Sequence, residues 1–178
     1  MGDAAARPLH WVYDLGDLDR AISSDPDRPE FWPTSVSPFY TLPTGQFSCY
    51  FDQALAVMTS INTQGGFDFK DICDEFERQF GPGSPYDMQK REEYMELRRR
   101  GEVQGPIQGK WLHGGMIKFF ENRRNMKGPQ ALYGDPHIKE TDGFCCSLPV
   151  VVRFAGTDGL MEKVLQVRIH TFRVLPNF

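Results

Sequence analysis

The feature that most constrains the fold is an amphipathic segment between Asp68 and Gly81. Asp68 suits a helix N-cap, because its side-chain oxygen can accept a hydrogen bond from a backbone amide of the first turn. Gly81-Pro82-Gly83 then ends the helical pattern. The apolar residues in between lie at i, i+3, i+4, i+7 and i+11, which predicts one buried helical face: Phe69, Ile72, Cys73, Phe76 and Phe80.

The segment before it predicts a partner helix. Ser48 is a suitable N-cap, and apolar residues at helical intervals continue from there to about Asn62. Gly65-Gly66 ends this pattern and leaves only a short turn before Asp68. Helices joined by so short a turn normally pack antiparallel, so we expect a helical pair.

Most other segments also favour helices. We expect helices in four further segments, namely residues 3–23, 85–100, 110–124 and from 158 onward. Pro8 and Gly16 are expected to break the first of these segments into two pieces. No strand alternates convincingly and no internal repeat is visible, so the sequence predicts an all-α fold.

Two segments are less regular. The apolar run 144–154 fits either a buried strand or a buried helix, and Pro149 among helical neighbours favours a proline-kinked buried helix. The stretch 25–45 holds five prolines interleaved with large aromatic residues, so we expect an ordered loop there. Because 178 residues suffice for one hydrophobic core, we expect residues 1–178 to form a single domain.

Composition and charge narrow the classes of function. The chain is 40% hydrophobic and 25% charged, which is typical of a folded globular protein. Its formal net charge is −4 and its pI is about 5.6. A protein with a negative net charge does not attract the phosphates of nucleic acid, so no nucleic-acid partner is expected.

The cysteines and the apolar runs bear on the cellular setting. The four cysteines form no CxxC pair and two are neighbours, so we interpret them as reduced, buried thiols. No stretch reaches the roughly 18 apolar residues of a membrane span, and the first residues do not read as a signal peptide. The expected setting is cytoplasmic or nuclear, with no membrane partner.

Common catalytic signatures are missing from the sequence. It has no GxGxxG after a strand, no phosphate-binding GxxxxGK[ST], no HExxH and no GxSxG. The histidines show no metal-ligand spacing, so each is interpreted as a surface or packing residue: His10, His113, His137 and His170. No catalytic residue is assigned.

Three stretches together resemble the ADP-ribosylglycohydrolase family, which includes enzymes and the related J-type crystallins. Residues 2–11 resemble its glycine-aspartate-alanine opening, and Tyr50-Phe51-Asp52-Gln53 stands where the family has its first acidic motif. Thr141-Asp142-Gly143, with the apolar run that continues to Gly156, resembles its glycine-containing ligand loop and the buried helix after it. The resemblance covers roughly residues 2–171, is nearest to the crystallin-like branch and implies an all-helical fold.

The resemblance implies a chemistry. Family enzymes hydrolyse an ADP-ribosyl N- or O-glycosidic bond and hold two magnesium ions between acidic clusters. It implies that Asp52 is a metal ligand and that Asp3, Asp142 and Gly143 bind ADP-ribose or an ADP-ribosylated substrate. Active members have Ser/Thr-Asp-Asp-Ser/Thr where this chain keeps the single carboxylate of Asp52, which predicts weak magnesium binding.

Simpler interpretations stay open for each of these residues. Asp52 also fits an ordinary acid in the first turn of a helix, where the dipole favours it. Asp3 also fits a helix cap, and Asp142-Gly143 fits a cap in a tight turn as well as a loop whose amides hold a diphosphate.

The resemblance stops before the end of the chain. The family's second acidic motif, Asp-x-Asp-Ser/Thr, does not occur before Phe178, so we expect an incomplete family domain with exposed apolar faces. Two functions remain in view. One is a catalytically impaired hydrolase, and the other is a non-catalytic, crystallin-like structural or ADP-ribose-binding relative. The sequence assigns no oligomeric state.

Overall fold

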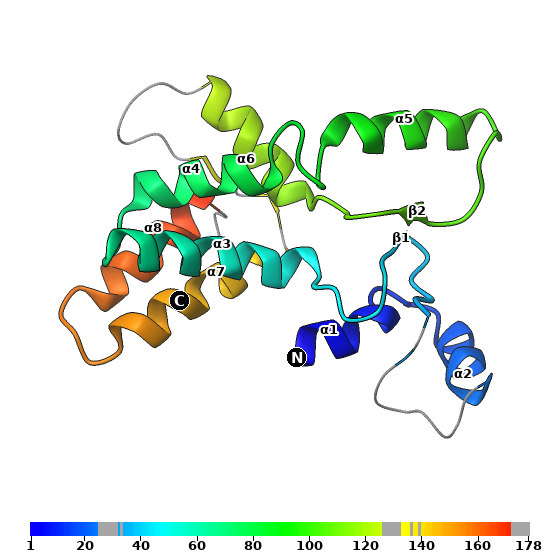
Figure 1. Cartoon of the computed structure of the whole chain (residues 1–178), viewed down its shortest axis with the longest axis horizontal. Helices are drawn as coiled ribbons and strands as arrows, with labels where there is room; N and C mark the ends of the chain where they lie inside the picture. Colours follow the sequence, from blue (N-terminus) through cyan, green and yellow to red (C-terminus); the bar gives the residue numbers. More distant parts are fainter. Residues whose placement is uncertain (25–31, 33, 126–132, 136, 139, 172–178) are drawn as a thin grey trace. The chain divides into compact units, whose positions relative to one another are not determined.

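A computed structural model describes residues 1–24, 32, 34–125, 133–135, 137–138 and 140–171 (Figure 1). Within these residues the chain forms eight α-helices, one short 3-10 helix and two strands of two residues each. The predicted all-α fold class is confirmed. Backbone contacts divide the chain into a first unit, Met1–Cys49 with Pro85–Trp111, and a second unit, Tyr50–Ser84 with Leu112–Phe178. The expectation that residues 1–178 are one domain stays a prediction.

The first unit combines short helices with a two-stranded sheet. Its elements in chain order are α1 (Gly2–Ala6), the 3-10 helix η1 (Arg7–Leu9), α2 (Leu15–Ser24), β1 (Tyr40–Thr41), α5 (Met88–Arg99) and β2 (Ile107–Gln108). The strands are parallel, with Tyr40 opposite Ile107. The predicted break at Gly16 is wrong, because Gly16 lies inside α2 and the interruption precedes Leu15. The side chain of Asp14 sets that start by accepting a hydrogen bond from the amide of Asp17.

Aromatic packing organises the first unit. The ring of Trp11 packs edge to face against Phe39, Tyr40 and Trp111, with centroids 5.5, 5.2 and 6.2 Å away. The guanidinium of Arg91 lies 4.5 Å from the centre of the Trp111 ring. Trp11 has a φ of +62°, an uncommon backbone conformation for a residue with a bulky side chain. These contacts hold Trp11 and Trp111 as packing anchors.

A buried arginine fixes the loop that precedes α3. Arg7 is fully buried. Its Nε donates a hydrogen bond to the carbonyl of Gln46 at 3.0 Å, and its Nη2 donates to the carbonyls of Leu42 and Pro43 at 2.9 Å each. One guanidinium therefore satisfies three carbonyls of residues 42–46, which belong to no helix or strand.

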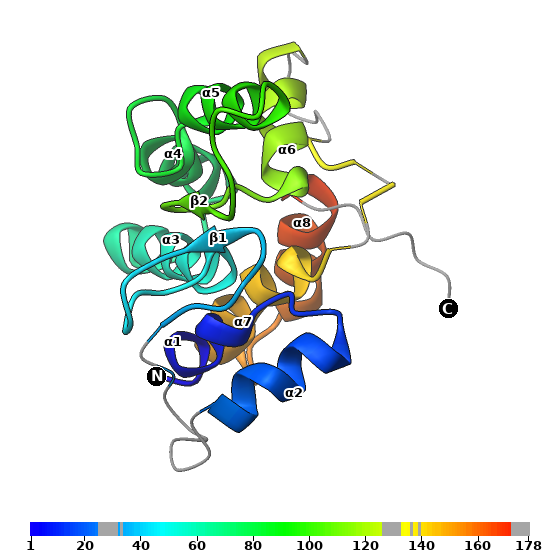
Figure 2. The same ribbon diagram turned by 90° about the vertical axis from the view of Figure 1, so that its right-hand side faces the viewer.

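The described part of the second unit is built from α-helices of 12 to 16 residues. They are α3 (Cys49–Gln64), α4 (Phe69–Phe80), α6 (Gly114–Asn125), α7 (Asp142–Phe154) and α8 (Leu160–Thr171). Cys49, the first residue of α3, belongs to the first unit. The predicted cap is confirmed, since the side chain of Asp68 accepts a hydrogen bond from the amide of Asp71. Helices α7 and α8 lie side by side (Figure 2). The predicted start of the 110–124 helix is wrong, because α6 begins at Gly114.

The apolar stripe of α4 forms the centre of this unit. Ile72, Cys73, Phe76 and Phe80 are buried as predicted, whereas Phe69, also expected on the buried face, is only half-buried. The ring of Phe76 contacts Phe80 and Phe119 at centroid distances of 6.0 and 5.7 Å. Burial raises the pKa of the Cys73 thiol to about 12, so this thiol stays protonated. None of the four cysteines, all of which the structure describes, forms a disulfide bond, and Cys145 is only half-buried.

Helix α7 is only partly buried. The apolar run is helical, as predicted, and Pro149 lies inside the helix. Pro149 and Val150 are buried, but Val152 is 81% exposed. The expectation of a buried helix is therefore wrong for one face, because an apolar composition does not specify which side a neighbouring element covers.

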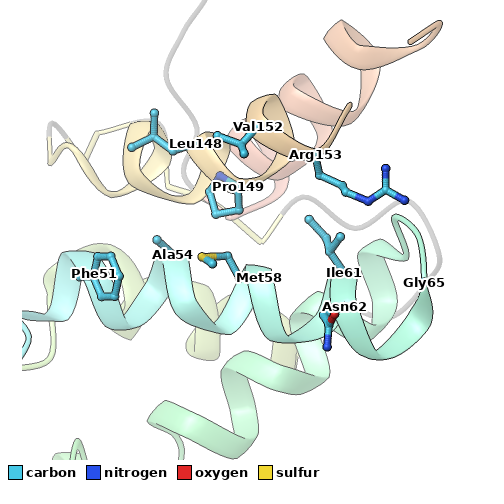
Figure 3. A pocket seen from close by; sticks show the side chains of 10 residues that line it. All are labelled: Phe51, Ala54, Met58, Ile61, Asn62, Gly65, Leu148, Pro149, Val152 and Arg153. Atoms are coloured by element: carbon cyan, nitrogen blue, oxygen red, sulfur yellow. The ribbon is translucent and has the colours of Figure 1, made fainter. Parts of the chain in front are cut away.

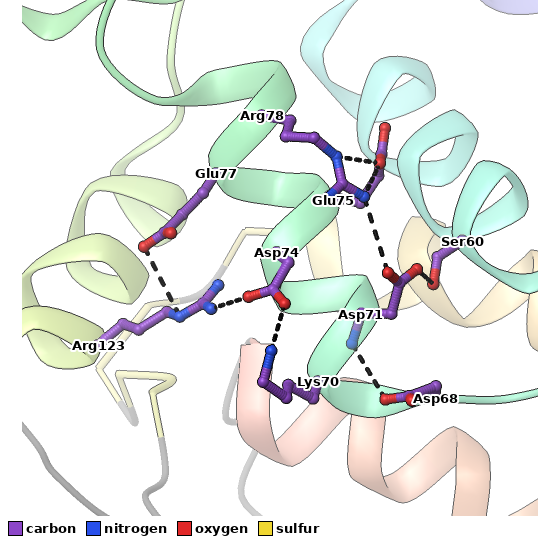
Figure 4. Close-up of polar contacts among 9 residues, drawn as sticks. All are labelled: Ser60, Asp68, Lys70, Asp71, Asp74, Glu75, Glu77, Arg78 and Arg123. Carbon is purple, nitrogen blue, oxygen red and sulfur yellow. Dashed lines mark hydrogen bonds and ion pairs between the residues drawn. The ribbon is translucent and has the colours of Figure 1, made fainter. Parts of the chain in front are cut away.

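Polar side chains of α4 form hydrogen bonds to both α3 and α6 (Figure 4). Ser60 of α3 donates a hydrogen bond to the carboxylate of Asp71, 2.6 Å away. The carboxylate of Asp74 accepts hydrogen bonds from Lys70, at 2.6 Å, and from Arg123 of α6. Burial raises the pKa of Asp74, but these two hydrogen bonds lower it by more, so its pKa lies below the ordinary value.

Replacing Asp74 with asparagine should destabilise the protein at pH 7 by up to about 1 kcal/mol. A carboxyl whose pKa is lowered in the folded state stabilises the fold above its unfolded pKa, and the benefit is lost as pH falls through the folded pKa. The difference between variant and wild type should therefore shrink below about pH 4. Urea unfolding at pH 7 and pH 3 tests this, with the exposed Asp19→Asn as control. An equal difference at both pH values would contradict the prediction.

Candidate functional site

Three buried polar side chains meet in the second unit. Gln53 comes from the N-terminal part of α3, His113 immediately precedes α6, and Asp142 is the first residue of α7. Gln53 and Asp142 are fully buried, and His113 is 2% exposed. Such groups are costly to bury unless they are hydrogen-bonded to one another, so their contacts define this cluster.

The carboxylate of Asp142 is the centre of the cluster. Its Oδ1 lies 2.5 Å from Nδ1 of His113. The same oxygen also accepts a hydrogen bond from the side-chain amide of Gln53. The His113 ring packs edge to face against Tyr50, with centroids 4.3 Å apart. On the other side, the thiol of Cys146 lies 3.6 Å from the amide oxygen of Gln53.

One oxygen of this carboxylate is unsatisfied. Oδ2 of Asp142 is buried and has no hydrogen-bond partner. Leaving a buried polar atom unpaired costs about 1–3 kcal/mol, and more for a charged group. The protein therefore holds a buried acceptor that a cation or a donor could satisfy.

Glu140 forms the more open side of the cluster. Its side chain is half-buried, and its carboxylate accepts hydrogen bonds from the amides of Gly114, at 3.3 Å, and Gly115, at 2.9 Å. These amides belong to the first turn of α6, where a carboxylate complements the helix dipole. Ligand atoms of His113, Glu140 and Asp142 all lie within 4.8 Å of one another.

The structure places the predicted ligand loop at this cluster. Asp142 and Gly143 are the first residues of α7, and both are buried. The amides of Phe144 and Cys145 both bond to the carbonyl of Thr141, within the first turn of the helix. The predicted role of Asp142 and Gly143 in binding ADP-ribose stays a prediction.

Asp3 and Asp52 lie elsewhere. In the first unit, the carboxylate of Asp3 accepts hydrogen bonds from the amide of Ser48, at 2.8 Å, and from its hydroxyl. This contact ties α1 to the residue that precedes α3. Asp3 lies inside α1, whose N-cap is Met1, so the alternative interpretation of Asp3 as the cap of that helix is wrong. Asp52 is half-buried in the first turn of α3.

The residues around Asp52 test whether it lies in a magnesium site. Among the residues that the structure describes, the one group of three close metal-ligating side chains does not include Asp52. Its neighbour Phe51 lines an apolar groove. Magnesium requires several oxygen ligands in octahedral geometry, so these described surroundings do not fit a magnesium site. The metal role of Asp52 stays a prediction.

The groove beside Phe51 lies between α3 and α7 and has a volume of about 570 Å³ (Figure 3). Phe51, Ala54 and Met58 line one side, while Leu148 and Val152 line the other. The lining is mostly apolar, and Met58 and Val152 are among the exposed large hydrophobic residues of the chain.

Sequence reasoning missed Gln53, His113 and Glu140 as members of the buried cluster. Gln53 and His113 lie 89 and 29 residues from Asp142. No helical or strand period links positions so far apart, so the pairing arises only in the folded chain. Of the cluster, the sequence alone indicated only Asp142, through its place in the pair Asp142-Gly143.

Fold and site thus define an all-helical protein with a buried acid–histidine cluster. The chain is 27% identical over 176 residues to crystallin J1A of Tripedalia cystophora, a match that covers 97% of this chain and 50% of the crystallin. Crystallin J1B of the same animal matches with the same identity and coverage. The chain therefore spans about half the length of the curated relatives it matches.

Two further comparisons gave no relatives. No protein-family model matches the chain, and no solved structure matches it. A search of the described residues for membrane spans found no helix with the length and apolar character needed to cross a bilayer.

Proposed function

We propose that this chain is an ADP-ribosylglycohydrolase-like protein of the crystallin-like branch, in which hydrolysis of ADP-ribosyl bonds is impaired. Its similarity to two J1 crystallins along 97% of its length supports the relationship. The observation that carries the proposal is the stretch Tyr50-Phe51-Asp52-Gln53, which holds one carboxylate where active members of the family have two.

The surroundings of this stretch support an impaired centre. Phe51 faces the apolar groove instead of offering an oxygen ligand. Gln53 is fully buried, and its amide is hydrogen-bonded to Asp142. Within the stretch 50–53, Asp52 is the single carboxylate that could attract a hard cation, and one carboxylate binds magnesium weakly.

The consequence for chemistry is direct. Cleavage of an ADP-ribosyl bond builds positive charge at the anomeric carbon and requires a positioned water. In the family, magnesium supplies the charge that aligns the ribose hydroxyls and that water. A chain without the acidic pair keeps the helical scaffold and loses this alignment, so the second candidate function is a non-catalytic structural or ADP-ribose-binding role.

The unaltered protein should release no ADP-ribose from an ADP-ribosylated peptide above the protein-free rate, with or without magnesium. Phe51→Asp restores an acid next to Asp52, so this variant should gain a magnesium-dependent rise in Tm. The wild type should show no such rise. Thermal melts and a release assay, each run with magnesium and with a chelator, measure both effects.

Met58→Asp is the matched control, because Met58 lines the same groove. It introduces an identical charge on α3, six residues beyond Asp52, and should gain no response to magnesium. Magnesium-dependent release of ADP-ribose by the unaltered protein would overturn the proposal. An equal magnesium response of the two variants would contradict the role given to Phe51.

A further inference from the structure

We propose that His113, Glu140 and Asp142 bind a divalent transition-metal ion of the zinc class. The inference rests on the buried cluster alone and does not depend on the proposed function. One imidazole nitrogen and two carboxylate oxygens converge within 4.8 Å of one another. Atoms that bind zinc at ~2.0–2.2 Å lie about 3–4 Å apart, so small rotations of these side chains suffice to enclose an ion.

The unsatisfied oxygen of Asp142 is the independent observation that points to a ligand. Asp142 is fully buried, and its Oδ1 already forms hydrogen bonds with His113 and Gln53. Its Oδ2 has no hydrogen-bond partner. A purely structural hydrogen-bonded core would pair both oxygens, because an unpaired buried carboxylate oxygen is destabilising. A bound cation would satisfy Oδ2 and offset the two neighbouring negative charges.

The neighbouring groups already orient the three side chains. The Gln53 amide holds the Asp142 carboxylate, and the amides of Gly114 and Gly115 hold the carboxylate of Glu140. Lone pairs are left for a metal on Oδ2 of Asp142, which has no partner, and on the two oxygens of Glu140, each of which accepts one of these amide hydrogen bonds. Hydrogen bonds of this kind to the ligands of a metal site fix their geometry and raise affinity.

The ligand set selects the class of ion. Imidazole suits zinc, cobalt, nickel and iron, whereas magnesium and calcium prefer sites made only of oxygen ligands. Glu140 is half-buried while the other two ligands are buried, so the ion would enter on the side of Glu140. Three protein ligands leave the fourth position of a tetrahedral ion to water.

Calorimetric titration of the chelator-treated full chain with zinc ions, in the absence of any nucleotide, tests the proposal. We expect one zinc ion per chain, with a rise in Tm on addition of zinc and none with magnesium. Glu140→Gln should weaken zinc binding at least tenfold. This variant keeps an acceptor oxygen for the Gly115 amide, so it retains the hydrogen bond that holds α6.

His113→Gln provides a second loss-of-ligand variant, while the exposed His137→Gln and Glu162→Gln are matched controls that should bind as the wild type does. Affinity should also fall as the pH is lowered, since protons compete with the metal for all three ligands. Zinc binding of unchanged affinity in Glu140→Gln would assign the ion to other groups, such as the cysteines, and overturn the proposal. Absence of stoichiometric binding by the wild type would overturn it as well.

Discussion

Replacing Phe76 with alanine should lower the free energy of unfolding by about 3–5 kcal/mol. Phe76 is fully buried on α4, and its ring packs edge to face against Phe80 and Phe119. Truncation removes the contacts of a whole ring and leaves a cavity that the surrounding rigid helices can close only in part. Urea unfolding followed by far-ultraviolet circular dichroism measures the loss.

Phe144→Ala is the matched control, because Phe144 is 61% exposed on α7. The same chemical change there should alter stability by about 0.5 kcal/mol at most. A cost below about 1 kcal/mol for Phe76→Ala would mean that the centre of the second unit is not closely packed. The two variants together separate the effect of burial from that of removing a phenyl ring.

Local signals explain why α4 could be predicted closely. The side chain of Asp68 caps the first turn, and Gly81 follows the last residue of the helix. Both ends depend on residues within a few positions of the boundary, and so does the apolar period of the buried face. The helical state of α7 was predicted on a different ground, namely Pro149 and the helices expected on either side of the run, and it is confirmed.

The burial of α7 and the pairing of the strands depend on distant residues, and there the predictions failed. Val152 is exposed although the run 144–154 is strongly apolar. The parallel pairing of Tyr40 with Ile107 joins strands of two residues each, which are too short to show alternation. Asp142 emerged from the resemblance, but its partners did not, because each lies on a different segment of the chain.

Replacing Arg7 with alanine should destabilise the first unit by about 2–4 kcal/mol. The guanidinium of Arg7 is fully buried and donates to the carbonyls of Leu42, Pro43 and Gln46. Hydrogen bonds from a charged donor contribute about 1.5–3 kcal/mol each and are not additive. Alanine removes these donors and leaves a cavity, so residues 42–46 lose their anchor.

Arg7→Lys should recover only part of the loss, because an ammonium group cannot reproduce the planar fork that reaches three carbonyls. Arg20→Ala is the control, since Arg20 is exposed and its salt bridge to the nearby Asp17 lies on the surface. Equal stability of Arg7→Ala and Arg20→Ala would contradict the role assigned to Arg7.

Tryptophan fluorescence lets the Arg7 variant also test the single-domain expectation. Trp11, Trp32 and Trp111 all lie in the first unit, whereas circular dichroism reports helices of both units. If residues 1–178 unfold as one domain, Arg7→Ala and Phe76→Ala should each shift the fluorescence and dichroism transitions together. If the units unfold separately, Phe76→Ala should leave the fluorescence transition unchanged while Arg7→Ala moves it. Coincident transitions in both variants would support one cooperative domain, and divergence would divide the chain at the boundaries of the two units.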